Sequence, residues 1–452
     1  MSSGMVMQLA AAAIGEGDGA LPHMVEVNGA VAAAHEQIEA EELPTVMLCC
    51  SQTGLGSFVM KTTQSSSWPD LEPELLGLVL KRLPILADRV RLRAVCCPWR
   101  SNARLQALPP PNPCLILLDG SFLSIPGGEI IGMPKQYDGC SYGFIDNWLF
   151  LVKSDGGCSL VNPFSKATVD LPKIAMDIDP FNKYSYSYST FNPCRYKLVV
   201  SSPLDSSPDS PVTVLILDGG GNATIGVCQP PIAFDFSRGN FLDPFQRLFD
   251  VTFFDGKFYG LDFGLLTFEI SYGLGSKPKI SSIENVINSM DNIPDLPKPL
   301  SDKERMVTKY LVECCGRLLM VTRWLEIPRR LLAASNYFEH VRTTSFEIFE
   351  ADLSTNPNQW RRIKNLGGQA LFVGRRCSKS FPAGEGNGIQ EDCIYFMCDY
   401  PWPDHPEDPL GDSGVYNIAN GMITPLLSET ATVPRHQRGQ WTLTWYFPVD
   451  AV

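Results

Sequence analysis

The sequence lacks the residue patterns of most metal sites and of common hydrolases. Its 14 cysteines include no C-x-x-C pair, and its 5 histidines (His23, His35, His340, His405 and His436) show no ligand spacing. It contains no G-x-S-x-G motif, and neither Gly219–Gly221 nor Gly384–Gly388 leads into a predicted helix that would hold a phosphate. We therefore expect no catalytic residue, no metal and no cofactor, and reduced cysteines that serve as small buried side chains.

A dominant basic region and a membrane-length apolar stretch are also missing. The chain has 37 Lys and Arg against 49 Asp and Glu, a formal net charge of −12, which argues against nucleic acid as a main partner. The stretch Val46–Met60 is too short and too polar to span a bilayer. We expect no membrane association, and a protein of the nucleus and/or cytoplasm.

The first 67 residues are rich in Ala, Gly, Glu and Ser, with a helix-capable piece at Ala30–Glu42. We expect this N-terminal extension to be disordered or partly helical. No charged region precedes the apolar run Leu9–Ile14, so a secretory signal is not expected.

Helical spacing is clear in one segment, residues 68–108. Its apolar residues recur three and four positions apart, as on one face of a helix: Leu75, Leu76, Val79, Leu80, Leu83, Val90, Ala94, Val95 and Trp99. Pro73 suits the first position of a helix that ends at Pro84, Asp88 is a candidate cap for a second, and Pro98 for the start of a third. About forty residues cannot bury enough apolar surface alone, so this stripe is expected to meet a partner.

The same segment resembles an F-box. The resemblance rests on residues in a shared order: Trp68, Leu71, Pro73, Glu74, Leu75, Leu76, Leu83, Pro84, Arg93, Val95, Cys96, Trp99 and Arg100. It implies a small three-helix unit that docks on a Skp-type adaptor and, through it, on a cullin. Two positions depart from the pattern, since Leu71-Glu72 replaces the usual Leu-Pro pair and Cys97 replaces a basic residue.

The adaptor-binding residues that this resemblance implies are Leu71, Pro73, Leu75, Leu76, Val79, Leu80, Leu83, Val90, Val95, Cys96 and Trp99. The other interpretation of the segment is an amphipathic hairpin that packs only on the rest of its own chain.

The pattern changes after a proline-rich linker at residues 109–113. From residue 114 to 452, short apolar runs alternate with Gly, Pro, Asn and Asp, which is typical of strands and turns. Phe253–Tyr259 predicts a hairpin with an Asp255-Gly256 turn. Loose units recur at the spacing of propeller blades, so we expect a β-propeller of about six to seven blades. A two-sheet sandwich is the alternative. The expected class is α+β multidomain.

This second region resembles a plant F-box family's C-terminal domain, the domain of unknown function 295. The similar stretches are Leu160–Phe164 with Leu171-Pro172, Phe254–Asp262, Leu366–Gly374 and Cys393–Phe396. The resemblance implies a propeller that binds a client protein. Seven arginines stand in basic clusters and are candidates to bind an acidic or phosphorylated client segment if several of them converge on one propeller face: Arg323, Arg329, Arg330, Arg361, Arg362, Arg375 and Arg376. The alternative is solvated charge on loops.

Together these patterns predict a substrate-recognition subunit of an SCF-type ubiquitin ligase, with no catalytic activity of its own. A ligase-independent propeller scaffold or inhibitor with a degenerate F-box is the main alternative, and a ligand-binding or hydrolytic propeller is a weaker one.

Overall fold

The computed structural model divides the chain into two units between Pro111 and Asn112. Among the described residues, the α-helices lie in the first unit and the strands in the second. The predicted N-terminal extension, residues 1–67, lies outside the described residues. The structure describes residues 72–132, 140–145, 147–153, 157–163, 166–171, 195–202, 213–219, 222–228, 235–236, 248–262, 264–271, 279–288, 302–332, 337–384, 386–399, 408–427 and 443–449.

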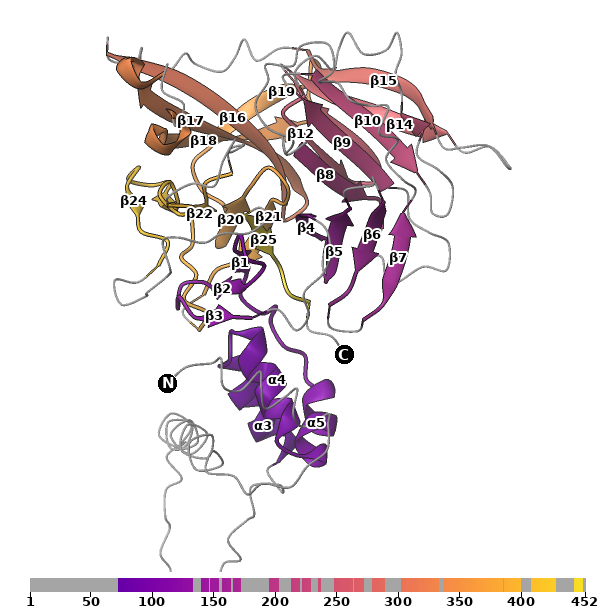
Figure 1. Ribbon diagram of the computed structural model, residues 1–452, viewed down its shortest axis with the longest axis vertical. Coiled ribbons are helices and arrows are strands. Elements are labelled where there is room, and N and C mark those ends of the chain that lie inside the picture. The colour runs from indigo at the N-terminus through magenta and orange to yellow at the C-terminus, as the bar shows by residue number, and fades with distance from the viewer. Residues whose placement is uncertain are drawn as a thin grey trace, which may run out of the picture. The chain divides into compact units, whose positions relative to one another are not determined.

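The helical unit contains three helices among its described residues: α3 (Pro73–Lys81), α4 (Leu86–Ala94) and α5 (Cys97–Arg104) (Figure 1). Pro73 occupies the first position of α3, where a missing N–H has no helical partner to lose. Asp88 does not cap α4, because the helix begins three residues earlier than the sequence suggested, after Ile85. Asp88 instead lies in the first turn, where its negative charge interacts favourably with the helix dipole.

In the described part of the chain, the second unit contains six β-sheets, each of four or five hydrogen-bonded strands (Figure 1). The first sheet has the order β25 (Thr444–Tyr446), β1 (Cys114–Ile116), β2 (Phe122–Ser124) and β3 (Ile130–Ile131). The next contains β4 (Cys140–Ile145), β5 (Trp148–Val152), β6 (Cys158–Val161) and β7 (Thr168–Leu171). The third contains β8 (Arg195–Val200), β9 (Thr213–Gly219), β10 (Asn222–Cys228) and β11 (Asp235–Phe236).

The remaining three sheets complete the series. One contains β12 (Asp250–Phe254), β13 (Lys257–Leu261), β14 (Leu265–Ser271) and β15 (Lys279–Ile287). Another contains β16 (Lys303–Cys314), β17 (Arg317–Pro328), β18 (Arg342–Asp352) and β19 (Gln359–Ile363), with the short 3-10 helices η2 (Arg329–Leu331) and η3 (Tyr337–His340) between β17 and β18. The last has the order β21 (Lys379–Pro382), β20 (Gln369–Val373), β22 (Cys393–Phe396), β23 (Gly414–Asn417) and β24 (Ile423–Thr424).

The sheets follow one another as propeller blades do. One edge strand of each sheet contacts the corresponding strand of the next, in the order β25, β4, β8, β12, β16 and β21. The sandwich alternative is therefore wrong, because two stacked sheets would not give this ring of neighbours. The predicted Asp255-Gly256 hairpin is confirmed: both residues have positive φ, and they join β12 to β13.

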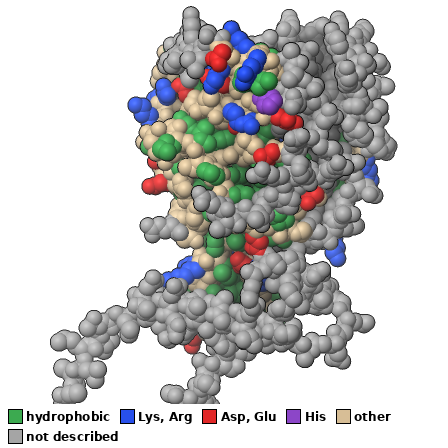
Figure 2. All heavy atoms as spheres, turned by 60° about the vertical axis from the view of Figure 1, so that its left-hand side comes forward, with side chains coloured by type: hydrophobic (Ala, Val, Ile, Leu, Met, Phe, Trp, Pro, Cys, Tyr) green, Lys and Arg blue, Asp and Glu red, His purple; other side chains and the backbone are tan. Residues whose placement is uncertain are grey.

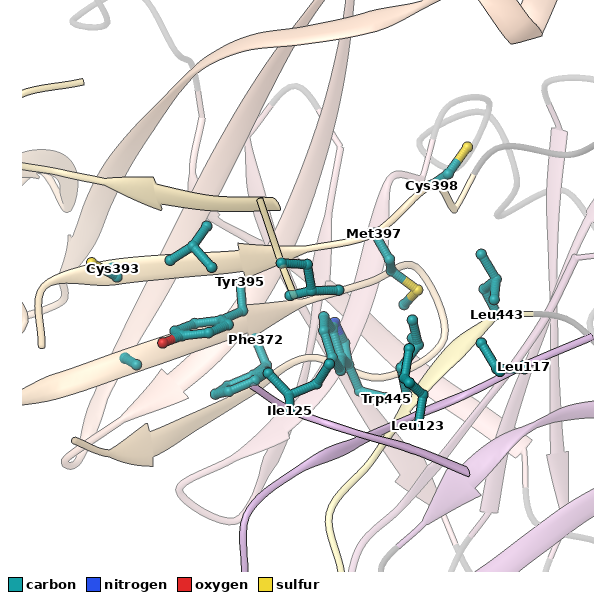
Figure 3. Packing of buried hydrophobic residues seen from close by; sticks show 14 of the residues in the cluster. Leu117, Leu123, Ile125, Phe372, Cys393, Tyr395, Met397, Cys398, Leu443 and Trp445 are labelled. Atoms are coloured by element: carbon teal, nitrogen blue, oxygen red, sulfur yellow. The ribbon is translucent and has the colours of Figure 1, made fainter. Parts of the chain in front are cut away.

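The ring closes by pairing its C-terminal strand with its N-terminal one. β25 lies antiparallel to β1, with Trp445 opposite Leu115. Trp445 is fully buried, and its indole N–H donates to the carbonyl of Val373 in the neighbouring sheet at 2.8 Å. Figure 3 shows Trp445 among side chains of several strands, including Phe372 and Leu123. A single apolar cluster thus joins the first sheet to the last.

Candidate protein-interaction site

The helical unit encloses a small apolar core of its own. Its buried members are Leu76, Val79, Leu80, Leu92, Trp99 and Ala103. Four of the predicted adaptor-binding residues therefore point inward: Leu76, Val79, Leu80 and Trp99. The expectation that the whole apolar stripe must meet a partner is wrong for these four, because three helices crossing one another cover the side chains that a single helix would expose.

The other predicted adaptor-binding residues remain at or near the surface. Val90 and Val95 are exposed by 45% and 41%. Pro73, Leu75, Leu83 and Cys96 are half-buried, and Leu71 lies outside the described residues. Leu105, which follows α5, is 80% exposed and was missed by the sequence analysis. The sequence signal for this residue is a leucine placed directly after the last turn of the third helix, where it can be exposed to solvent.

Basic side chains accompany these apolar ones. Lys81, Arg82, Arg100 and Arg104 are exposed, and Lys81 and Arg104 lie in the last turns of α3 and α5. Cations at helix C-termini are favoured by the helix dipole. The unit thus offers exposed aliphatic side chains in a basic setting, which suits an acidic partner with an apolar contact surface.

A buried arginine fixes the shape of the helical unit. Arg89 of α4 is fully buried, and its Nε donates to the carbonyl of Leu83, in the turn after α3, at 2.7 Å. Its Nη1 donates to the carbonyl of Pro109, in the proline-rich segment after α5, also at 2.7 Å. The arginine thereby ties α4 to the segments that follow the other two helices.

We expect Arg89→Met to loosen the helical unit selectively. The methionine fills the apolar part of the site, but it removes the donor to the Leu83 and Pro109 carbonyls, and hydrogen bonds from a charged group contribute about 1.5–3 kcal/mol each. Hydrogen–deuterium exchange on the full chain should show faster exchange across residues 73–104 and unchanged exchange in the propeller. Arg91→Met is the matched control, since it removes an arginine of the same helix whose ion pair with Asp88 is half-buried. Equal effects of the two substitutions would contradict the role assigned to Arg89.

The predicted anionic-segment site is wrong for Arg323. This residue of β17 is fully buried rather than exposed to a client. Its Nε donates to Thr343 Oγ1 at 2.8 Å, and its Nη1 donates to the Met397 carbonyl at 2.9 Å. It also forms ion pairs with Asp399 at 3.2 Å and Asp412 at 2.8 Å. Arg323 therefore joins its own sheet to the next one.

Two further groups belong to this buried network. The hydroxyl of Tyr310 on β16 donates to Asp399 Oδ2 at 3.0 Å, and the backbone N–H of Arg375 donates to the same oxygen at 2.9 Å. Burial, followed by the charge of Asp399, raises the pKa of Tyr310 well above its ordinary value. Tyr310 therefore stays a neutral donor at any physiological pH.

The other predicted client-binding arginines lie on separate elements. Arg361 and Arg362 of the outermost strand β19 pair with Glu350 and Glu347, and Arg329 pairs with Glu304. Arg330 is exposed, whereas Arg375 and Arg376 are half-buried in the segment between β20 and β21. The face in Figure 2 likewise carries Lys and Arg side chains mixed with Asp and Glu rather than a patch of one sign. Binding of an acidic segment by the exposed arginines stays a prediction.

A second buried charge connects consecutive sheets. Asp250 at the start of β12 forms an ion pair with Lys197 of β8, and one of its oxygens accepts the N–H of Leu311 on β16 at 2.8 Å. Burial raises the pKa of Asp250, while Lys197 and the backbone donors act in the opposite direction. This carboxylate joins edge strands of three successive sheets, which is a structural role.

The described residues include possible metal ligands and free cysteine thiols. No group of three His, Cys, Asp or Glu side chains stands close enough to hold a metal ion there. Ten cysteines in the described part of the chain are free, and burial raises the pKa of Cys114 to about 12. Of the helices that the structure describes, none has the length and apolar character needed to cross a membrane.

Comparison with known proteins adds a family and several relatives. The model of a family described as the KIB1-4 beta-propeller matches residues 122–417. F-box protein At2g26160 of Arabidopsis thaliana is 23% identical over 351 residues, which is 74% of this chain and 96% of the relative. Putative F-box protein At2g04810 is 23% identical over 385 residues, or 80% and 91% of the two chains. F-box protein SKIP23, from the same plant, is 21% identical over 337 residues, or 68% and 78%.

These similarities agree with the ring of sheets and with the predicted propeller. The matching family carries a different description from the domain of unknown function 295, so membership of the latter stays a prediction.

Proposed function

Because this chain belongs to the KIB1-4 beta-propeller family, we propose that it is the substrate-recognition subunit of an SCF-type E3 ubiquitin ligase. In this proposal the helical unit is an F-box that binds a Skp-type adaptor and, through it, a cullin. The propeller binds a client protein. The chain itself forms no covalent bond; it raises the effective concentration of the client near the ubiquitin-transfer machinery. The protein would act in the nucleus and/or cytoplasm.

The exposure pattern of the helical unit is the observation that carries the proposal. A self-contained three-helix fold would be expected to cover its large aliphatic side chains, yet Val90, Val95 and Leu105 are at least 41% exposed. These are three of the eight exposed large apolar side chains among the described residues, in a unit of about forty residues. Relatives that match most of this chain are named F-box proteins, which supports a partner of the adaptor type.

We expect Val90→Glu and Leu105→Glu to weaken adaptor binding at least tenfold each, because a carboxylate would have to be buried against the partner without a counter-ion. Both positions are exposed, so the helical fold should persist in the variants. The measurement is the Kd of the purified full chain for a Skp-type adaptor, by isothermal titration calorimetry. Substitutions at Leu76 or Trp99 would not serve, since these residues form the core and their loss would unfold the unit.

The matched control is Ile423→Glu, which places the same charge at a 38% exposed aliphatic residue of the propeller. It should leave adaptor binding unchanged. If the wild-type chain shows no adaptor binding, the ligase proposal is wrong and a ligase-independent scaffold replaces it. If all three variants bind like wild type, the adaptor does not use the exposed aliphatic residues of the helical unit.

A further inference from the structure

An open pocket of about 500 Å³ lies between two neighbouring hairpin turns of the propeller. Its lining comprises Phe253, Phe254 and Asp255 from the β12–β13 hairpin, and Glu313 and Gly316 from the β16–β17 hairpin. The two hairpins belong to successive sheets whose strands β12 and β16 contact each other. The pocket is large enough for one or two amino-acid side chains of a partner.

The walls of this pocket are held in place by the turns themselves. Asp255 and Gly256 have φ of 45° and 77°, and Cys315 and Gly316 have φ of 51° and 73°. Two consecutive residues with positive φ give a tight two-residue hairpin loop whose twist matches that of the strands. The ring of Phe253 packs edge-on against Phe258 at 4.9 Å. A partner would therefore meet a surface that needs little ordering on binding.

The lining of the pocket is negative, because the described residues that form it include two carboxylates and no cation. Asp255 and Glu313 are both exposed, and neither forms an ion pair with any residue that the structure describes. Glu313 Oε1 accepts the N–H of Gly316 at 2.9 Å, which orients the carboxylate at the turn. Arg317, the nearest cation along this hairpin, is directed to Glu350 and to the carbonyl of Leu366 instead.

Aromatic rings beside carboxylates define the chemistry of the ligand. A cationic side chain gains from the two carboxylates, and the aliphatic stem of Lys or Arg can pack on the apolar lining that Phe253 and Phe254 contribute. The formal net charge of −12 for the whole chain also attracts a basic partner and repels an acidic one. The earlier expectation of an acidic client segment does not fit this pocket.

We propose that the pocket formed by Phe253, Phe254, Asp255, Glu313 and Gly316 binds a Lys or Arg side chain of an extended basic segment in the client protein. This inference rests on the proposed function, since it names what the propeller would recognise. The two carboxylates set the sign of the ligand, and the phenyl rings pack against its stem.

The test uses a fluorescein-labelled peptide of sequence Gly-Lys-Arg-Lys-Gly and the purified full chain, with fluorescence anisotropy as the readout. We expect saturable binding to wild type that weakens when NaCl is raised to about 0.3 M. The double variant Asp255→Asn/Glu313→Gln should raise the Kd at least tenfold. Both substitutions preserve the turns, because Asn tolerates positive φ and Gln can still accept the Gly316 N–H.

The matched control is Glu269→Gln/Glu284→Gln, which removes two exposed carboxylates outside the pocket. An equal loss in both double variants would overturn the proposal, because the peptide would then respond to net charge alone. Absence of binding to wild type would overturn it as well, as would equally tight binding of a Gly-Glu-Asp-Glu-Gly peptide.

The outcome is separable from that of the ligase proposal. A chain that binds the basic peptide but no Skp-type adaptor supports the pocket proposal and overturns the ligase proposal. A chain that binds the adaptor but not the peptide supports the ligase proposal and overturns the pocket proposal. Adaptor affinity of the Asp255→Asn/Glu313→Gln variant should equal that of wild type.

Discussion

Ending the chain at Leu443 is expected to prevent the propeller from folding. The truncation removes β25, so that β1 loses its partner strand and the first sheet loses one of its four strands. It also removes Trp445 from the cluster that joins the first sheet to the last. The loss of β25 leaves β1 as an unpaired strand edge and uncovers apolar side chains, which favours aggregation. The expected result is insoluble protein or loss of a cooperative thermal transition.

The point variant Trp445→Ala should show the same effect in graded form. Trp445 is fully buried, its ring lies edge-on to Phe372 at 5.0 Å, and its indole N–H bonds to Val373. Loss of a buried aromatic residue of this size costs about 3–5 kcal/mol of the free energy of unfolding. Chemical denaturation of the full chain measures the loss.

A chain that ends at Val449 is the control for the truncation. It keeps β25 and the bonds between Asn147 and Val449, whose carbonyl accepts the Asn147 side-chain amide at 3.0 Å. It should therefore melt like the full-length chain. A Leu443 truncation that remains soluble and melts cooperatively would show that the pairing of β1 with β25 does not hold the ring closed.

The second large effect is expected for Arg323→Met. The substitution removes the cation from between Asp399 and Asp412, whose carboxylates stay buried beside Tyr310 and Thr343. Removing one partner of a buried ion pair costs about 3–5 kcal/mol, because an uncompensated charge remains in a poorly solvated site. Chemical denaturation should show the loss as a lower midpoint.

Rescue by neutral residues separates a charge effect from a packing effect. Arg323→Met combined with Asp399→Asn and Asp412→Asn should be more stable than Arg323→Met alone, because no buried carboxylate then lacks its counter-ion. The surface variant Arg361→Met, which removes only a largely exposed pair with Glu350, should cost less than about 1 kcal/mol. If the triple variant is less stable than Arg323→Met, the network does not act through charge compensation.

Much of the architecture could be predicted from local patterns. Pro73 and Pro84 bound the first helix because the missing N–H and the fixed φ of proline act within one turn. Asp255-Gly256 specifies its hairpin because few residue pairs adopt positive φ at both positions. The start of α4 was placed less well, since Ile85 at its N-cap carries no side-chain cap and so gives no sequence signal.

The candidate sites could be predicted only in part. Arg323 and Arg361 look alike in sequence, yet the first is fully buried and the side chain of the second is 63% exposed. Their difference depends on Asp399 and Asp412, which lie between β22 and β23, more than seventy residues further along the chain. Likewise, Asp255 and Glu313 are far apart in sequence, and they line one pocket because β12 and β16 contact each other.

By itself, the sequence determined that residues 68–108 hold a helical unit that resembles an F-box, and that a strand-rich region follows the proline-rich segment. Local spacing and turn chemistry suffice for these conclusions, because they act over a few residues. The sequence favoured a propeller over a sandwich, and the order of the sheets in the structure decided between them. The tertiary structure decided that Leu76, Val79, Leu80 and Trp99 form a core, and that Val90, Val95 and Leu105 face outward. Burial depends on which elements cross in space, and helix crossing is not encoded in the period of any one segment.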